Sequence, residues 1–492
     1  MTLDADTCYR ALRARDARFD GRFFVAVSST RIYCRPVCTV KPPRKENCRF
    51  YPSHAAAESA GYRPCLRCRP ELAPGNASVD ATSRLAQAAA GLIEDRALDG
   101  DGMHAVASRL GISDRHLRRA FGAQFGVSPV EFAQTQRLLL AKRLLTDTAL
   151  PVTEVAFASG FGSLRRFNAL FKERYRLQPS RLRRHMKASG ARAEDALQFE
   201  LAYRPPYDWP AVSGFLAARA IAGVEAVEEG RYRRSVRIAA EGRPEAAANT
   251  GWIEVAPAPK KPALRVTVSA SLAKVLPPVL SRVKALMDLA CNPVEVAHAL
   301  GQDRSTLGVL AKRKPGLRVP GAFDGFEVAV RAIVGQQVSV AAARTIAGRI
   351  AAAFGEPVAT PFGAIDRAFP SAAMIAHLPY GLIARLGMPG ARAKTVIAVA
   401  RALADGTIAL VPNADIDATL EKLRALPGVG EWTAQYLAMR ALAWPDAFPH
   451  TDLGVLRALG ERDPKRVLAR AEAWRPWRAY AVMHLWNSTA KE

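Results

Sequence analysis

The stretch LPGVGEWTAQYLAMRAL at residues 426–442 decides the fold of the C-terminal half of this 492-residue chain. It places two glycines, Gly428 and Gly430, in a short turn directly before a helical pattern. A turn of this kind can present backbone N–H groups to a phosphate, and the helix N-terminus adds partial positive charge. The pattern is that of a helix-hairpin-helix, although any tight turn between two helices could use the same residues. We therefore predict that Gly428 and Gly430 contact a DNA backbone.

An aspartate follows this turn. Asp452 lies 22 residues after Gly430, within FPHTDLGVLRAL at 448–459. Aspartate is a common N-cap, so Asp452 could simply cap the helix predicted for LGVLRAL. Trp432 and Tyr436 stand four residues apart on one helix face, which suits a hydrophobic core as well as a ligand pocket. The hairpin, the carboxylate and the two rings together favour a catalytic site.

The charge balance points to a polyanionic partner. The chain has 70 Lys and Arg against 45 Asp and Glu, a formal net charge of +25. Such an excess is typical of proteins that bind nucleic acid. The apolar fraction of 49% excludes wholesale disorder, and no apolar run reaches the roughly 18 residues of a membrane span. Because the charged N-terminus lacks a signal-peptide core, we expect a cytoplasmic protein of about three domains that binds double-stranded DNA and no membrane.

Six of the seven cysteines lie in the first 68 residues. Four of them form two close pairs, Cys34 with Cys38 and Cys65 with Cys68, and 26 residues separate the pairs. Two pairs at this spacing suit one tetrahedral zinc ion, because each turn supplies two thiolates. A purely structural zinc that staples a small domain is the simpler interpretation. The odd total of cysteines does not suggest a disulfide framework.

Basic residues surround these cysteines. They are Arg35, Lys41, Arg44, Lys45, Arg63, Arg67 and Arg69. They form either an ordinary soluble surface or a positively charged rim for DNA, and the charge of the whole chain favours the rim.

The sequence contains one internal repeat. VASRLGIS at 106–113 matches VAFASGFGS at 155–163, and the match continues beyond both segments. Each copy predicts a helix, a glycine turn and a second helix, which is a helix-turn-helix. The second helices are expected to begin near Ser113 and Ser163. Their basic residues are candidates for contacts with phosphates and base edges: Arg115, Arg118, Arg119, Arg165 and Arg166. The alternative is a solvated basic face with only nonspecific affinity for DNA.

From residue 198 the pattern becomes strand-like. Period-2 runs such as QFELAYR and LRVTVSA predict a small antiparallel sheet, with a helix expected over 215–224. From about residue 277 the helical period returns and continues to the C-terminus. We therefore predict a multidomain protein: a small α+β cysteine domain at 1–75, an all-α helix-turn-helix domain at 84–187, an antiparallel α+β subdomain at 198–288 and a helical helix-hairpin-helix domain at 289–492. Segments 73–83 and 188–197 are predicted linkers.

Several segments of the last two parts resemble the AlkA-type 3-methyladenine DNA glycosylases over about residues 198–487. Among them are LACNP, FEVAVRAIVGQQVSVAAA and WRPWRAYAVMHLW. The resemblance implies that Asp452 is the catalytic carboxylate and that aromatic rings hold a base flipped out of the duplex. The pocket positions of the family fall on Trp432, Tyr436, Trp486 and Phe215. The wedge that fills the gap left by the base is aliphatic in the family and falls here on Gln337.

This resemblance also bears on mechanism. An N-alkylated purine is cationic and already activated as a leaving group, so one carboxylate near the developing oxocarbenium sugar can suffice. Electron-rich rings attract such a base. Related glycosylase/lyases carry a lysine at the position of Trp432, and tryptophan cannot form a Schiff base, so we expect a monofunctional hydrolase of the 3-methyladenine glycosylase II type. Cys291 is the only cysteine after Cys68, so we expect no iron–sulfur cluster.

The N-terminal segments GRFFVAVSSTRIYCRPVC and RPCLRC resemble the Ada-type methylphosphotriester acceptor over residues 8–72, and the repeats resemble the AraC-type DNA-binding domain. The first resemblance implies that a zinc-bound cysteine, Cys34, irreversibly accepts a methyl group from a DNA phosphotriester. Its partners on the zinc would be Cys38, Cys65 and Cys68. The second resemblance implies sequence-specific DNA binding, with RNA polymerase as a further partner.

These features together predict a monomeric adaptive-response protein that senses DNA methylation damage, activates transcription and excises alkylated bases, with one zinc ion as its cofactor. The Pro-Cys-His-Arg motif of the second Ada-type methyl acceptor does not occur. Two alternatives stay open. The chain could be a transcription regulator whose glycosylase-like part is catalytically idle, and the zinc could be only structural.

Overall fold

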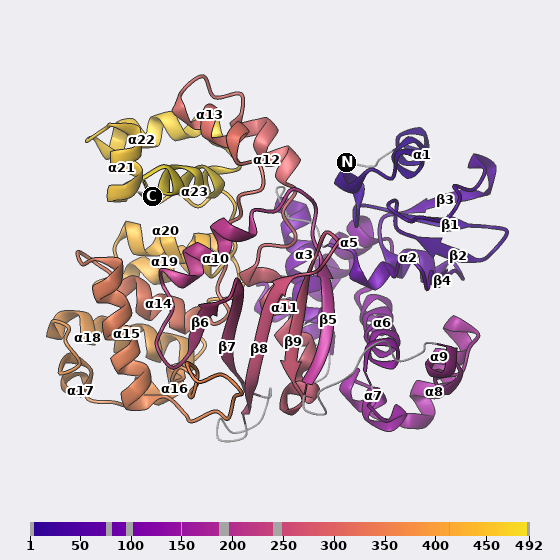
Figure 1. The fold of residues 1–492 in the computed structure, drawn as a ribbon, viewed down its shortest axis with the longest axis horizontal. Coiled ribbons are helices and arrows are strands. Elements are labelled where there is room, and N and C mark those ends of the chain that lie inside the picture. The colour runs from indigo at the N-terminus through magenta and orange to yellow at the C-terminus, as the bar shows by residue number, and fades with distance from the viewer. Residues whose placement is uncertain are drawn as a thin grey trace.

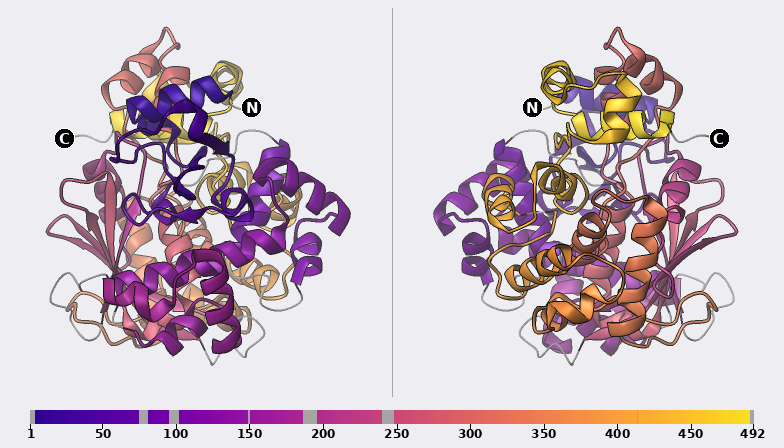
Figure 2. Two further views of the ribbon diagram at one scale, coloured as in Figure 1. Left: turned by 90° about the vertical axis from the view of Figure 1, so that its right-hand side faces the viewer. Right: turned by 90° about the vertical axis from the view of Figure 1, so that its left-hand side faces the viewer.

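A computed structural model describes residues 4–74, 81–94, 102–148, 150–185, 196–239, 248–412 and 414–489 (Figure 1). Three units follow one another along these residues: a cysteine unit at 4–74, a helix-turn-helix unit at 81–185 and a C-terminal unit at 196–489. The predicted linkers at 73–83 and 188–197 fall largely outside the described residues. The first two units lie on one side of the molecule and most helices of the third lie on the other (Figure 2).

The cysteine unit is a small sheet with short helices around it. Its strands run in the order β3-β1-β2-β4, and β2 pairs in parallel with β4. This pairing sets Tyr33 opposite Pro64, so the residues that follow them, Cys34 and Cys65, reach the same edge of the sheet. The elements are α1 (Ala5–Ala14), β1 (Phe24–Val27), β2 (Ile32–Cys34), β3 (Cys48–Tyr51), α2 (His54–Ser59) and β4 (Arg63–Pro64).

The helix-turn-helix unit contains both predicted repeats. Its elements are α3 (Ala81–Glu94), α4 (Gly102–Arg109), α5 (Asp114–Phe125), α6 (Pro129–Asp147), α7 (Val152–Ala158), α8 (Leu164–Tyr175) and α9 (Pro179–His185). Ser113 and Ser163 cap α5 and α8 at the equivalent position, and each side chain accepts a hydrogen bond from the backbone N–H three residues on. Phe121 and Phe171 lie at matching places on these two helices and are completely buried. The predicted start of each second helix is thus confirmed.

Helix α6 joins the repeats and is in contact with both other units. Lys142 is buried on α6, and its Nζ donates to both carboxylate oxygens of Glu71 in the cysteine unit, at 2.7 and 2.6 Å. On the same helix, Arg143 Nη2 donates to the backbone oxygen of Glu200 in the C-terminal unit at 2.7 Å. Helix α6 therefore links the cysteine unit to the C-terminal unit.

The C-terminal unit opens with the predicted antiparallel sheet. Its strand order is β5-β9-β8-β7-β6, and the elements are β5 (Ala196–Ala202), α10 (Trp209–Ala217), β6 (Glu225–Glu228), β7 (Arg231–Ile238), β8 (Asn249–Pro257) and β9 (Ala263–Ser269). The helix expected over 215–224 was placed wrongly. Asp208 caps a helix that begins at Trp209, and the chain leaves the helical conformation before Gly223, whose φ is +80°.

The rest of this unit is helical, as predicted. Its helices are α11 (Leu276–Leu286), α12 (Pro293–Leu300), α13 (Thr306–Arg313), α14 (Gly325–Val334), α15 (Val340–Phe354), α16 (Ala372–Ala376), α17 (Tyr380–Ala384), α18 (Gly390–Ala404), α19 (Ile416–Ala425), α20 (Glu431–Arg440), α21 (Leu453–Leu459), α22 (Pro464–Ala471) and α23 (Arg478–Thr489). In Figure 1, α20 lies between the lower group of helices, which includes α14 and α15, and the upper group with α21 and α23. This position lets side chains of α20 face both groups.

A carboxyl group is buried where the cysteine unit meets the second repeat. Glu58 Oε1 accepts hydrogen bonds from the hydroxyls of Tyr33 at 2.9 Å and Tyr175 at 3.4 Å. Its other oxygen, Oε2, is buried without a hydrogen-bond partner. Burial raises the pKa of Glu58 to about 8, because the loss of water outweighs the hydrogen bonds and the nearby cations.

We predict that the ionisation of Glu58 lowers the free energy of unfolding of the protein as the pH rises. Unfolded Glu58 loses its proton near the ordinary value of 4.5, whereas the folded protein holds it up to about pH 8. The folded state therefore binds more protons within this window, and its stability falls as the pH increases through it. Glu58→Gln cannot ionise, so it should gain about 1–3 kcal/mol over the wild type between pH 5.5 and 8.5. Denaturant unfolding at pH 5.5 and pH 8.5 measures this difference in the free energy of unfolding. The exposed Glu173→Gln is the control, and an equal pH response of Glu58→Gln and wild type would contradict the prediction.

Candidate metal centre and active site

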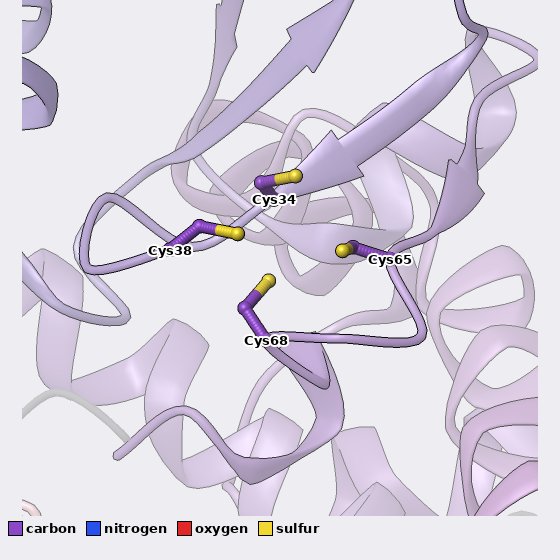
Figure 3. A group of neighbouring side chains, drawn as sticks. All are labelled: Cys34, Cys38, Cys65 and Cys68. Atoms are coloured by element: carbon purple, nitrogen blue, oxygen red, sulfur yellow. The ribbon is translucent and has the colours of Figure 1, made fainter. Parts of the chain in front are cut away.

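The four cysteines predicted as metal ligands come together beside β2 and β4. Their Sγ atoms all lie within 4.8 Å of one another, and the side chains converge from two turns (Figure 3). Sulfur ligands about 2.3 Å from a tetrahedral zinc stand about 3.8 Å apart, so this donor set fits one zinc ion. Cys34, Cys38 and Cys65 are buried, and Cys68 is partly exposed.

The predicted basic rim was wrong at two positions. Arg35 is buried, and its Nε donates to Asp20 Oδ1 at 2.8 Å while its Nη1 donates to the backbone oxygen of Cys68 at 3.3 Å. Arg69 pairs with Asp147 of α6 at 2.8 Å. Both guanidinium groups are engaged inside the protein, because each has a carboxylate partner there. The exposed members of the predicted rim are Lys41, Arg44, Lys45 and Arg67.

The predicted DNA-binding arginines of the repeats face solvent. Arg115, Arg118 and Arg119 are exposed on α5, and Arg165 and Arg166 are exposed on α8. The opposite faces of the two helices are buried in the core. Each repeat thus offers a basic outer face at the start of its second helix, which is the geometry that a major groove accepts.

The LPGVG segment forms the predicted hairpin between α19 and α20. Gly428 has a φ of +82°, and a Cβ there would lie 2.1 Å from Thr395 Oγ1, so this position requires glycine. Gly430 caps α20, and a Cβ there would meet nothing within 4 Å. The space beside Gly430 is therefore open at the start of α20, where a helix N-terminus could bind a phosphate.

A second glutamine ties the predicted wedge to this hairpin. Gln337 is exposed at the tip of the loop after α14, with a φ of +56°. Its neighbour Gln336 donates through Nε2 to the backbone oxygen of Gly428 at 3.1 Å and to Thr433 Oγ1 at 3.0 Å. Sequence reasoning missed Gln336, although a polar residue beside the wedge was a possible signal. The wedge loop and the hairpin are therefore held at a fixed separation.

Asp452 is the N-cap of α21 and also the centre of a larger network. Its Oδ1 accepts from the backbone N–H of Val455 at 3.0 Å and from Trp486 Nε1 at 2.8 Å. Its Oδ2 accepts from Trp432 Nε1 at 2.8 Å. Gly454 permits this packing, because a Cβ there would lie 3.0 Å from both Asp452 Oδ1 and Trp486 Cδ1. Sequence reasoning missed this glycine.

The four rings predicted for the base pocket cluster around this carboxylate. Trp432 and Tyr436 are stacked, with ring centroids 5.2 Å apart and an interplanar angle of 18°. Trp486 lies 6.3 Å from Tyr436 and also 6.3 Å from Phe215, and it is nearly parallel to Phe215 at 15°. The rings come from α10, α20 and α23, so the tertiary fold brings together side chains that are far apart in the sequence.

Comparisons with known proteins match every unit. Four family models fit the chain: the metal binding domain of Ada at 7–71, a helix-turn-helix domain at 106–185, the AlkA N-terminal domain at 198–324 and the HhH-GPD superfamily base excision DNA repair protein at 330–477. A probable bifunctional transcriptional activator/DNA repair enzyme AlkA of Mycobacterium tuberculosis is 40% identical over 99% of this chain and 96% of its own length. The chain belongs to this family.

Two further relatives each match one part of this AlkA-type protein. DNA-3-methyladenine glycosylase 2 of Escherichia coli is 36% identical over 58% of this chain and 96% of its own length. The bifunctional transcriptional activator/DNA repair enzyme AdaA of Bacillus subtilis is 30% identical over 37% of this chain and 84% of its own length. The protein therefore joins a DNA glycosylase to an Ada-type zinc-binding and helix-turn-helix regulator, and its partner is DNA. In the part of the chain that the structure describes, no helix is long and apolar enough to cross a membrane.

We predict that the purified protein contains one zinc ion per chain. Cys65→Ser should lose the metal, because three thiolates hold zinc more weakly than four, and the cysteine unit should then unfold at a lower temperature. Metal analysis together with thermal unfolding measures both effects. Cys48→Ser is the matched control, since Cys48 is also buried but lies outside the cluster. Zinc retained in full by Cys65→Ser would show that this cysteine is not a ligand.

Proposed function

We propose that this protein hydrolyses the N-glycosidic bond of alkylated purines in double-stranded DNA, of the 3-methyladenine and 7-methylguanine type, with Asp452 as the catalytic carboxylate. The observation that carries the proposal is the position of this carboxylate, which two pocket tryptophans hold through their indole N–H groups at 2.8 Å. A half-buried carboxylate among aromatic rings can face the sugar of a base that the rings hold.

The proposed reaction uses the Asp452 carboxylate, the aromatic rings and one water molecule. The bond from C1′ of the sugar to the base breaks, and its electron pair goes to the cationic base, which leaves uncharged. Asp452 stabilises the positive charge that develops on the sugar. Water then adds to C1′, and its proton passes to Asp452 or to solvent, which leaves an abasic site. The indole N–H bonds to Asp452 draw electron density toward the rings and favour contact with a cationic base.

The same arrangement supports a monofunctional enzyme. Trp432 Nε1 is engaged with Asp452 at 2.8 Å, and an indole cannot form the Schiff base that a lyase needs. We also propose that zinc is the only metal of the protein. After Cys68 the sequence holds one cysteine, Cys291, whereas an iron–sulfur cluster is held by several thiolates.

We predict that Asp452→Asn releases 3-methyladenine from methylated duplex DNA at least about a hundredfold more slowly than the wild type. Asparagine still caps a helix, so the fold should survive, but the negative charge that opposes the sugar cation is gone. Base release, thermal unfolding and binding to abasic-site DNA are measured together. Asp463→Asn is the control, because Asp463 is also a side-chain N-cap, that of α22. Unchanged release by Asp452→Asn would refute the assignment, and a wild type without any release would favour the catalytically idle regulator.

We propose further that Cys34 accepts a methyl group from a DNA methylphosphotriester. The Cys34 Sγ attacks the methyl carbon, the bond from methyl to phosphate oxygen breaks, and a thioether and an anionic phosphodiester result. Cys34, Cys38, Cys65 and Cys68 would hold a zinc ion, which would keep their thiols ionised at neutral pH. The exposed cations Lys41, Arg44 and Arg67 beside the cluster support an approach of the DNA backbone.

We predict that exposure to methylphosphotriester DNA adds the mass of one methylene group, about 14 Da, to Cys34. Peptide mass spectrometry locates the adduct. The control Cys48→Ser should be modified to the same extent, because Cys48 is outside the cluster. An adduct on Cys38, Cys65 or Cys68 would reassign the acceptor, and no adduct at all would leave the zinc with a structural role only.

The regulatory part of the proposal rests on the two exposed basic helices. Arg115, Arg118 and Arg119 of α5 and Arg165 and Arg166 of α8 are proposed to contact the operator. Gly428, Gly430 and Gln337 are proposed to contact DNA at the glycosylase. We propose that the protein acts as a cytoplasmic monomer and contacts RNA polymerase when it is bound upstream of a promoter.

A further inference from the structure

A buried arginine contacts two of the four rings predicted for the base pocket. Arg440 stands one helical turn after Tyr436 at the end of α20 and is 5% exposed. Its Nη1 donates to the hydroxyl oxygen of Tyr436 at 2.8 Å, its Nη2 donates to the backbone oxygen of Gly321 at 3.0 Å, and its Nε donates to the backbone oxygen of Pro320. Within the described residues, no carboxylate forms an ion pair with this guanidinium.

Two pocket rings take the place of an acidic partner. The guanidinium carbon of Arg440 lies 4.7 Å from the ring centroid of Phe215 and 5.6 Å from that of Tyr436. A second guanidinium, that of Arg219, lies 3.7 Å from the centroid of Phe215. A buried charge is costly unless polar or π groups compensate it, and here carbonyl oxygens, a phenol oxygen and ring faces do so. Arg440 therefore contacts two of the four rings predicted for the base pocket.

The cluster of four rings consequently has one side next to a carboxylate and one side next to cations. Trp432 and Trp486 hold the carboxylate of Asp452, whereas Tyr436 and Phe215 are in contact with cations. Burial by itself would raise the pKa of Tyr436, but Arg440 and Arg219 outweigh burial and hold it below its ordinary value. The positive charge therefore acts on a ring of the pocket.

We propose that Arg440 is a positioning and specificity-determining residue, which holds Tyr436 and Phe215 in the pocket wall and whose charge weakens the preference of the pocket for cationic over neutral damaged bases. The proposal rests on the proposed glycosylase function and deepens it. A cationic purine stacked on Tyr436 is attracted by the rings and by Asp452 but repelled by Arg440. A neutral base with a carbonyl or ring nitrogen on its edge remote from the sugar escapes this repulsion and presents an acceptor to the side next to the cations.

The test compares base release from two duplexes that differ only in the damaged base. One carries 7-methylguanine, which is cationic, and the other carries hypoxanthine, which is neutral, each opposite cytosine. The measured quantity is the ratio of kcat/KM for 7-methylguanine to that for hypoxanthine, in the wild type and in Arg440→Met and Arg440→Lys. Differences in intrinsic bond reactivity cancel when the ratios of two variants are compared.

Removal of the charge should raise this ratio. We expect Arg440→Met to increase it about tenfold or more, the size expected for one charge about 8 Å away at an effective dielectric constant of about 20. Arg440→Lys keeps the charge but loses the planar fork, so both rates should fall while the ratio stays within about threefold of the wild type. Arg219→Met should raise the ratio in the same direction, and it tests the charge effect if Arg440→Met fails to fold. The exposed Arg466→Met is the matched control.

The possible outcomes separate the claims. Equal losses for both bases in Arg440→Met would leave Arg440 a structural role only and overturn its role in specificity. Release of 7-methylguanine without measurable release of hypoxanthine by the wild type would overturn the inference and leave the proposed function intact. A wild type that releases neither base would contradict the proposed function itself.

Discussion

The carboxylate of Asp452 accepts hydrogen bonds from N–H groups of three helices. The C-terminal unit must bring these three helices together at one side chain. Trp432 stands at the start of α20, Trp486 lies on α23, and the capped N–H of Val455 belongs to α21. Gly454 helps the three helices to meet at one side chain, because a Cβ there would lie 3.0 Å from both Asp452 Oδ1 and Trp486 Cδ1. Once they meet, the orientation of the carboxylate is fixed before any DNA binds, and such preorganisation is the main way in which a fixed charge stabilises a transition state.

Buried charges also hold the three units together. Lys142 of α6 pairs with Glu71 of the cysteine unit, and both side chains are almost completely buried. Burial alone would raise the pKa of Glu71, but Lys142 and Arg69 outweigh it and lower the pKa. If the units separated, Lys142 and Glu71 would lose each other as partners. The packed apolar surface around α6 would be lost as well, so separation is unfavourable. The cysteine unit, the helix-turn-helix unit and the C-terminal unit are thus parts of one packed body.

Local patterns in the sequence predicted local structure well, but they did not predict ionic and polar contacts between residues that are far apart in the sequence. The hairpin glycines, the N-cap serines and the cysteine pairs each follow from a few neighbouring residues, because turn geometry and ligand spacing are local properties. The role of Arg440 was not predictable from its neighbours in the sequence, since its partners Pro320 and Gly321 lie about 120 residues away. The rim prediction failed at Arg35 for a different reason. The position of Arg35 beside a cysteine in the sequence does not reveal that the fold brings Asp20 against its guanidinium and holds that guanidinium inside the protein.

The simplest alternative for Asp452 was that it only caps a helix. The geometry shows which hydrogen bonds of the side chain this role explains. A cap needs one carboxylate oxygen and one backbone N–H, and Oδ1 with Val455 supplies both. The bonds from Trp486 to Oδ1 and from Trp432 to Oδ2 contribute nothing to capping. They orient two rings of the predicted base pocket, Trp432 and Trp486, toward the carboxylate instead. Capping and the proposed chemistry are therefore compatible uses of one side chain, because the cap sets the direction of the carboxylate and the indoles connect it to the place where a base can lie.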